Sequence, residues 1–135
     1  MKAFDQARII LTGAGSGIGL VLLRQLYPHT REILAVDFNP EYLDRLRLEF
    51  PDLRGILEVD LSKKEGNQKI LNWVETYWDR VDFCFANARK AEYGLAKKQD
   101  WENMDCIFQL NVFSPIQLGF QLRNQFPDTQ LRHVI

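Results

Sequence analysis

The sequence of 135 residues is 46% hydrophobic and 26% charged, a composition that predicts one globular domain over residues 1–135. Its formal net charge of -1 gives no electrostatic basis for binding nucleic acid or an anionic membrane surface. No apolar run is long enough to span a membrane and no signal peptide is recognisable, so we expect a cytoplasmic protein without membrane contact.

Cysteine and histidine are both scarce. Cys84 and Cys106 each lie in an apolar stretch and are expected to be buried thiols in a reducing compartment. His29 and His133 lie far apart in the sequence and have no ligand-like cysteine or carboxylate beside them. No metal site is therefore predicted.

The predicted elements alternate between strands and helices. A strand is expected at Arg8–Leu11, and a glycine-rich turn leads from it into a helix over Ile18–Tyr27. A second strand follows at Ile33–Val36. Asn39, a typical N-cap, and the proline after it open a helix that is expected to run to about residue 50.

A third strand is expected at Ile56–Val59. Ser62 and Glu65 then form an S-x-x-E pattern that is typical of a capping box. This pattern predicts a helix from there to about residue 78. A fourth strand follows at Val81–Ala86.

A long helical pattern extends from Asp100 to about Phe126, and Pro115 is expected to kink it or divide it in two. A fifth strand is predicted to begin at His133–Ile135. The strands are short apolar runs without alternation of apolar and polar residues, and helices separate them. This pattern is typical of parallel strands buried on both faces, so the predicted fold is α/β and doubly wound.

The stretch "ILTGAGSGIGLVLL" has four glycines between a predicted strand and a predicted helix. Glycine tolerates the positive φ angles of a tight turn and lets a phosphate approach the backbone closely. A helix that begins near Gly17 presents unpaired N–H groups and the positive end of its dipole to an anion. The spacing, T-G-x-x-x-G-I-G from Thr12 to Gly19, predicts a phosphate-binding turn. A structural turn without a ligand is the minor alternative.

This arrangement resembles the cofactor fingerprint of the short-chain dehydrogenase/reductase family. The resemblance implies a Rossmann-type sheet with strand order 3-2-1-4-5 and a nicotinamide dinucleotide cofactor. It covers the whole chain but only the cofactor-binding half of the family's domain, because the sequence stops inside the expected fifth strand. It implies cofactor contacts at Thr12, Gly13, Gly15, Ser16, Gly17, Ile18 and Gly19.

Asp37 follows the second predicted strand, where an acidic residue of a Rossmann unit accepts hydrogen bonds from the adenosine ribose hydroxyls. A 2′-phosphate would instead face a carboxylate, and like charges about 4 Å apart repel by roughly 4 kcal/mol at an effective dielectric of about 20. Ser16 stands where NADP-using relatives often carry a basic residue. Both features predict NAD in preference to NADP.

Asp60 ends the third predicted strand and resembles the family's aspartate near the adenine ring, with Leu61 beside it. A turn of sequence Asp-Leu-Ser is an equally supported structural interpretation of Asp60. After the fourth strand, the chain reads Ala86-Asn87-Ala88-Arg89 where the family has N-N-A-G, so Asn87 and Ala88 match, and Asn87 is expected to tie this strand to its neighbours. Arg89 departs from the motif, because its Cβ replaces a glycine beside the nicotinamide ribose.

Asn111 matches the family's helix asparagine, which supports a proton-relay water beside the catalytic lysine. A solvated or capping asparagine is the structural alternative. In the family, the catalytic serine and the Tyr-x-x-x-Lys pair come after the fifth strand, and this sequence has no counterpart of them there. Tyr93 and Lys97 have the right spacing, but they precede the Asn111 helix, so we interpret the match as a coincidence.

The sequence therefore predicts the NAD-binding Rossmann unit of an oxidoreductase that does not transfer hydride by itself. Two alternatives stay open. One is a non-catalytic scaffold or oligomerisation module. The other is an active oxidoreductase that is completed by a partner chain or uses Tyr93 and Lys97.

Self-association is also expected. The fifth strand would form an unpaired sheet edge, which invites pairing with another chain. The helix over residues 103–126 would present an apolar face without the helix that normally follows it. We therefore predict a homo-oligomer through the strand edge, the helix face or both. The residues assigned to this face are Ile107, Leu110, Phe113 and Leu118.

Overall fold

The apolar runs of the sequence form a parallel sheet in the computed structural model, which describes residues 2–95, 98–126 and 133–134. Within these residues the strand order is β3-β2-β1-β4-β5, as predicted. Every neighbouring pair of strands runs parallel. The last residue of the expected fifth strand, Ile135, lies outside the described residues. The strands are β1 (Ile9–Thr12), β2 (Ile33–Asp37), β3 (Gly55–Glu58), β4 (Phe83–Phe85) and β5 (His133–Val134).

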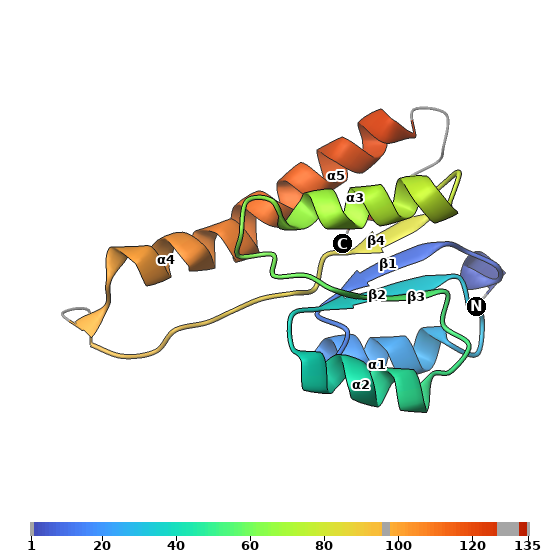
Figure 1. The fold of residues 1–135 in the computed structure, drawn as a ribbon, viewed down its shortest axis with the longest axis horizontal. Helices are drawn as coiled ribbons and strands as arrows, with labels where there is room; N and C mark the ends of the chain where they lie inside the picture. The colour runs from blue at the N-terminus through green and yellow to red at the C-terminus, as the bar shows by residue number, and fades with distance from the viewer. Residues whose placement is uncertain (1, 96–97, 127–132, 135) are drawn as a thin grey trace.

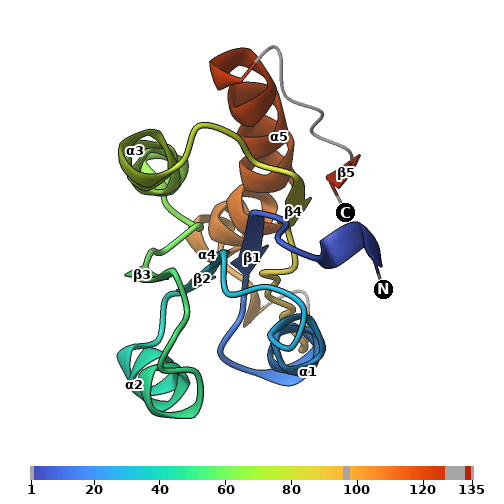
Figure 2. The same ribbon diagram turned by 90° about the vertical axis from the view of Figure 1, so that its right-hand side faces the viewer.

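Helices cover both faces of this sheet (Figure 1). The views in Figures 1 and 2 agree that α1 and α2 lie on one face and that α3 and α5 lie on the other. A short 3-10 turn, η1 (Lys2–Phe4), precedes β1. The helices are α1 (Gly17–Leu26), α2 (Pro40–Glu49), α3 (Gly66–Tyr77), α4 (Trp101–Phe108) and α5 (Ser114–Gln125), and α4 and α5 are joined by a π-helical turn, η3 (Gln109–Phe113).

The apolar run Ile9–Leu11 of β1 is explained by the central place of this strand in the sheet. Ile9 and Leu11 point into the core under α1 and α2, and Ile10 points into the core under α3 and α5. All three side chains are fully buried. Because both faces of the sheet are covered, its strands need no polar side, which is the pattern read from the sequence.

The start of α2 was predicted correctly, and the start of α3 was not. The Asn39 side chain accepts a hydrogen bond of 3.0 Å from the Glu41 N–H and caps α2. Ser62 caps no helix. Its N–H and hydroxyl donate to the Asp60 carboxylate at 2.9 and 2.6 Å, and α3 begins at Gly66 without a side-chain cap. The aspartate turn takes the hydroxyl that a capping box would need.

The predicted long helix is not divided at Pro115. It continues from α4 through η3 into α5, and the Ser114 N–H donates to the Gln109 carbonyl, five residues earlier. Proline lacks an N–H and clashes with the carbonyl four residues earlier in a regular helix, and the wider π turn relieves both problems. The buried positions of this helix are Gln109, Ser114, Leu118 and Leu122. The first two are one residue further apart than the later neighbours, because the π turn lies between them.

The two cysteines differ in burial, although both were expected to be buried. Cys84 is buried in β4, and burial raises the pKa of its thiol to about 12, so it stays protonated near neutral pH. Cys106 is only half-buried, and both cysteines are free. In the described part of the chain, no group of acidic, histidine or cysteine side chains could hold a metal ion, and none of the helices found there could cross a membrane.

Candidate functional site

The glycine-rich turn connects β1 to α1 at the carboxyl end of the sheet and is packed tightly on its inner side. Gly13 has a φ of +66°, and an ideal Cβ on it would lie 2.9 Å from the Cα of Ala88. A Cβ on Gly19 would lie 1.9 Å from the Gly13 carbonyl oxygen. The turn therefore needs residues without side chains at both positions.

The outer side of the same turn is open. Gly17 has a φ of +51°, and no atom lies within 4 Å of the position of an added Cβ. Ser16, the N-cap of α1, makes no side-chain cap hydrogen bond. The first N–H groups of a helix have no intrahelical partner, so α1 presents its positive end at an exposed backbone.

The Asp37 carboxylate joins β2 to this turn. Its Oδ2 accepts a hydrogen bond of 2.9 Å from the Gly15 N–H, and its Oδ1 accepts one of 3.2 Å from the Asn39 N–H. Asp37 is only 6% exposed. A carboxylate can accept about four hydrogen bonds, so roughly two acceptor positions remain beside the turn.

The end of β4 is tied to β1 in the way expected of Asn87. The Asn87 Nδ2 donates to the carbonyls of Thr12 and Gly13, both at 3.3 Å. The Ala88 N–H donates to the Thr12 hydroxyl at 3.1 Å. These bonds hold the segment after β4 directly against the glycine-rich turn.

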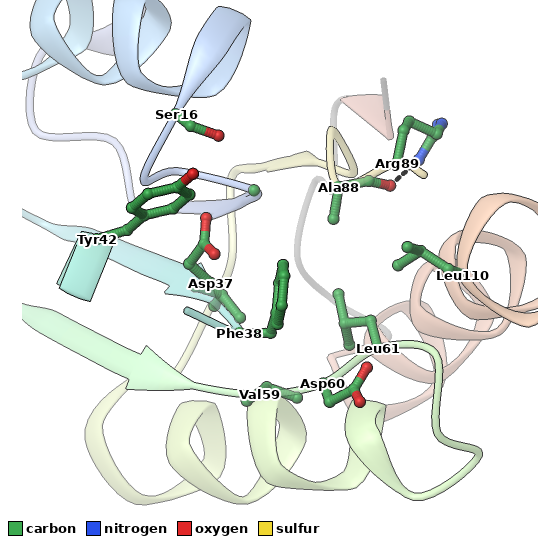
Figure 3. A pocket seen from close by; sticks show the side chains of 12 residues that line it. Ser16, Asp37, Phe38, Tyr42, Val59, Asp60, Leu61, Ala88, Arg89 and Leu110 are labelled. Atoms are coloured by element: carbon green, nitrogen blue, oxygen red, sulfur yellow. Dashed lines mark hydrogen bonds between the residues drawn. The ribbon is translucent and has the colours of Figure 1, made fainter. Parts of the chain in front are cut away.

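One pocket, with a volume of about 100 Å³, lies between these elements (Figure 3). It is bordered by the carboxyl ends of β2 and β3, the glycine-rich turn and the segment after β4. Half of the residues that line it had been assigned to a cofactor site from the sequence. These are Gly13, Ser16, Asp37, Asp60, Leu61 and Ala88.

The other predicted contact residues do not line this pocket. Four of them are buried or half-buried, namely Thr12, Gly15, Gly19 and Asn87, whereas Gly17 and Ile18 are exposed at the start of α1. Asp60 belongs both to a local turn and to the pocket lining. One of its oxygens is used by the turn to Ser62, as the structural interpretation held, and its side chain borders the pocket.

The apolar lining of the pocket was not predicted from the sequence. Phe38 is 65% exposed, and its ring lies between Asp37 and Leu61 in Figure 3. Tyr42 packs on the turn, since a Cβ on Gly15 would lie 2.5 Å from the Tyr42 Cβ. Phe38 could have been found from its place directly after Asp37. The missed lining residues are Val36, Phe38, Tyr42, Val59 and Leu110, together with Arg89, which had been noted only as a departure.

Asn111 lies in η3 and is not among the residues that line this pocket. Its Nδ2 donates to the Lys90 carbonyl at 2.7 Å, and its Oδ1 accepts from the Lys90 N–H at 3.0 Å. It thus fixes the segment between β4 and α4 against the helix. Tyr93 is 91% exposed and lies outside the pocket lining, and Lys97 lies outside the described residues.

This arrangement can be compared with known proteins. A family model described as "short chain dehydrogenase" matches residues 7–130. The chain belongs to the short-chain dehydrogenase family. Members of this family use nicotinamide dinucleotide cofactors, and the chain corresponds to the N-terminal portion of the family's oxidoreductases.

Two dehydrogenases share about a third of the matched residues with this chain. A 1,2-dihydroxy-1,2-dihydronaphthalene dehydrogenase from Ralstonia sp is 34% identical over 113 residues, which cover 81% of this chain and 44% of that protein. The Pseudomonas putida protein of the same name is 32% identical over 114 residues, with 82% and 44% covered. The chain thus spans less than half the length of these relatives.

Solved short-chain dehydrogenases share the fold. One from Streptomyces avermitilis is 25% identical with a TM-score of 0.75, over 90% of this chain and 45% of that one. The 3-ketoacyl-(acyl-carrier-protein) reductase from Brucella melitensis, solved with NADH, is 22% identical with a TM-score of 0.79, over 91% and 51%.

Proposed function

We propose that this chain is the NAD-binding part of a short-chain dehydrogenase/reductase-type oxidoreductase. One observation carries the proposal: a single pocket is bordered by the open glycine-rich turn, by the buried Asp37 carboxylate and by the Asn87-Ala88 segment. Each of these belongs to the pattern that the sequence shares with the family. Together they supply an anion site and a ribose site within one small space.

The residues present fit a dinucleotide. The open backbone at Gly17 would hold the diphosphate, because no side chain obstructs the first N–H groups of α1. The unused acceptor positions of Asp37 would take the adenosine ribose hydroxyls. Phe38 and Leu61 would form apolar contacts with the adenine ring. The bound cofactor would supply hydride exchange, whereas these residues bind and orient it.

The preference for NAD over NADP follows from the same geometry. The Asp37 carboxylate is held in place by two backbone N–H groups, so it cannot easily turn away from a 2′-phosphate. Ser16 adds no positive charge to the turn. We propose that the described residues do not transfer hydride alone, because the exposed Tyr93 lies outside the pocket lining.

Calorimetric titration of the purified chain with NAD and NADP tests this function. We expect NAD to bind and NADP to bind more weakly, with no change in nicotinamide absorbance when alcohols are added with NAD. If no heat is detected even at millimolar NAD, the chain is a scaffold that does not bind the cofactor. If an alcohol is oxidised, and Tyr93→Phe abolishes the activity, Tyr93 is catalytic.

We also propose that the chain self-associates through the long helix. The exposed apolar face differs from the one expected from the sequence. Leu118 is buried and Leu110 is half-buried, because both pack into the core under α3. Ile107 is half-buried as well, whereas Phe113 is exposed. The face that stays exposed consists of Phe108, Val112, Phe113, Ile116 and Phe120, each 39–64% exposed.

Charge on this face should dissociate the oligomer. The double variant Ile116→Glu/Phe120→Glu would bury two unpaired carboxylates at the contact, and we expect the dissociation constant to rise at least about 10-fold. Leu48→Glu is the matched control, since Leu48 is 85% exposed on α2. Sedimentation velocity measures the change. A wild-type chain that is strictly monomeric at high micromolar concentration would refute self-association, and an unaffected oligomer would point to the β5 edge instead.

A further inference from the structure

Arg89 gives the pocket a positive charge that the glycine-rich turn lacks. Twelve residues line the pocket, all within the described part of the chain, and Arg89 is the only cationic one among them. The lining carries two carboxylates, Asp37 and Asp60. Without Arg89, the charged side chains of the lining would only repel an anionic ligand, and the positive end of the α1 dipole would be left to attract it.

The backbone position of Arg89 is fixed close to the turn. Its neighbour Ala88 donates to the Thr12 hydroxyl at 3.1 Å, and the Ala88 Cα stands 2.9 Å from the position of a Cβ on Gly13. Because Ala88 is in contact with the turn, the backbone of Arg89, the next residue, is held near the turn as well. Figure 3 shows its side chain at the rim of the pocket, across from Ser16 and Asp37.

The guanidinium of Arg89 is only partly engaged. Its Nη1 donates to the Ala88 carbonyl at 2.7 Å, a bond within its own segment, and the side chain is exposed. No carboxylate pairs with it among the described residues. An arginine has five N–H donors in a planar fork that matches phosphate oxygens, so most of its donors stay available.

We propose that Arg89 binds the diphosphate of the dinucleotide, turning from the Ala88 carbonyl onto the ligand. This inference rests on the proposed cofactor site and names an anchor for it. The anion would then lie between the first N–H groups of α1 and a guanidinium, and charge-assisted hydrogen bonds of this kind are the stronger ones. Arg89 would thereby give the diphosphate a cationic partner from the pocket lining.

The test separates the diphosphate from the nucleoside. ADP and adenosine are titrated calorimetrically into the wild-type chain and into Arg89→Gln, Arg89→Lys and the control Lys90→Gln. Lys90 is an adjacent exposed cation that does not line the pocket. We expect Arg89→Gln to weaken ADP binding about 10-fold and to flatten its salt dependence, because one cation no longer meets the phosphates. Arg89→Lys should keep part of the affinity, and adenosine binding should not change.

Each other result overturns the inference in a recognisable way. If the wild type binds neither ADP nor NAD, the proposed function fails and the inference fails with it. If the wild type binds ADP and Arg89→Gln binds it equally well, the function stands and Arg89 is no diphosphate ligand. If adenosine binding falls as much as ADP binding, Arg89 acts on the shape of the pocket. Thermal unfolding of each variant confirms that it is folded.

Discussion

Gly19→Ala is expected to abolish the native fold or to lower the free energy of unfolding by about 3 kcal/mol or more, because the added methyl group overlaps backbone atoms. The new Cβ would lie 1.9 Å from the Gly13 oxygen and 2.7 Å from the Asn87 Nδ2. These two atoms are hydrogen-bonded to each other, so neither can move without opening the tie between β1 and β4. Helix propensity alone predicts the opposite sign, a gain of about 1 kcal/mol for alanine over glycine.

Gly17→Ala is the matched control. Gly17 lies two residues earlier in the same helix, and no atom would contact its added Cβ. Only its φ of +51° opposes alanine, and a left-handed backbone costs an L-residue roughly 1–2 kcal/mol. Urea denaturation of both variants gives the comparison. A Gly19→Ala protein as stable as the wild type would show that the turn has room for a methyl group at this position.

Asp37→Asn is expected to reverse the cofactor preference. The amide keeps the shape of the side chain but removes the charge that would face a 2′-phosphate. The Coulomb repulsion of roughly 4 kcal/mol at 4 Å, reduced by screening, corresponds to a change on the order of 100-fold in the ratio of the NAD and NADP dissociation constants. Calorimetric titration with both dinucleotides measures this ratio.

Asp60→Asn separates this effect from a general loss of negative charge. Asp60 lines the same pocket, and its oxygen is held by Ser62 in a turn. We expect the Asp60→Asn variant to change NAD and NADP affinity alike and to leave their ratio within about 3-fold, since the exposed Asp60 charge is screened by solvent. Asp37→Asn should also lower stability by about 1–3 kcal/mol, because one of two backbone N–H groups loses its acceptor. An unchanged ratio in Asp37→Asn would remove Asp37 from cofactor selection.

The strands and their order could be predicted because burial on both faces leaves an unambiguous pattern. Ile9, Ile10 and Leu11 are all buried, so the apolar run itself marks the strand. The start of α3 could not be predicted in this way. The Ser62 side chain could either cap the helix or bond the Asp60 carboxylate, and the sequence alone does not indicate which of these two interactions is more stable.

The π turn also depends on contacts that are distant in the sequence. Asn111 is bonded to Lys90, 21 residues away, and Ser114 is bonded to Asn67, 47 residues away. Pro115 indicated a disturbance at this place, but its form is fixed by those partners. The candidate site likewise contains residues that could be predicted from a local pattern and residues that could not. The glycine turn and Asp37 follow from a local pattern, whereas Leu110 joins the pocket only through the path of the long helix.

The tie between Thr12 and Ala88 also has a consequence for how the chain folds. The two residues are 76 positions apart, and contacts of such separation form late because a long loop must close first. The turn, Asp37 and Asp60 can assemble while β4 is still unpaired, and a nascent chain at that stage has half a pocket. Ala88 and Arg89 complete it when β4 docks on β1. A dinucleotide would therefore bind only the finished sheet and favour it over every partly folded form.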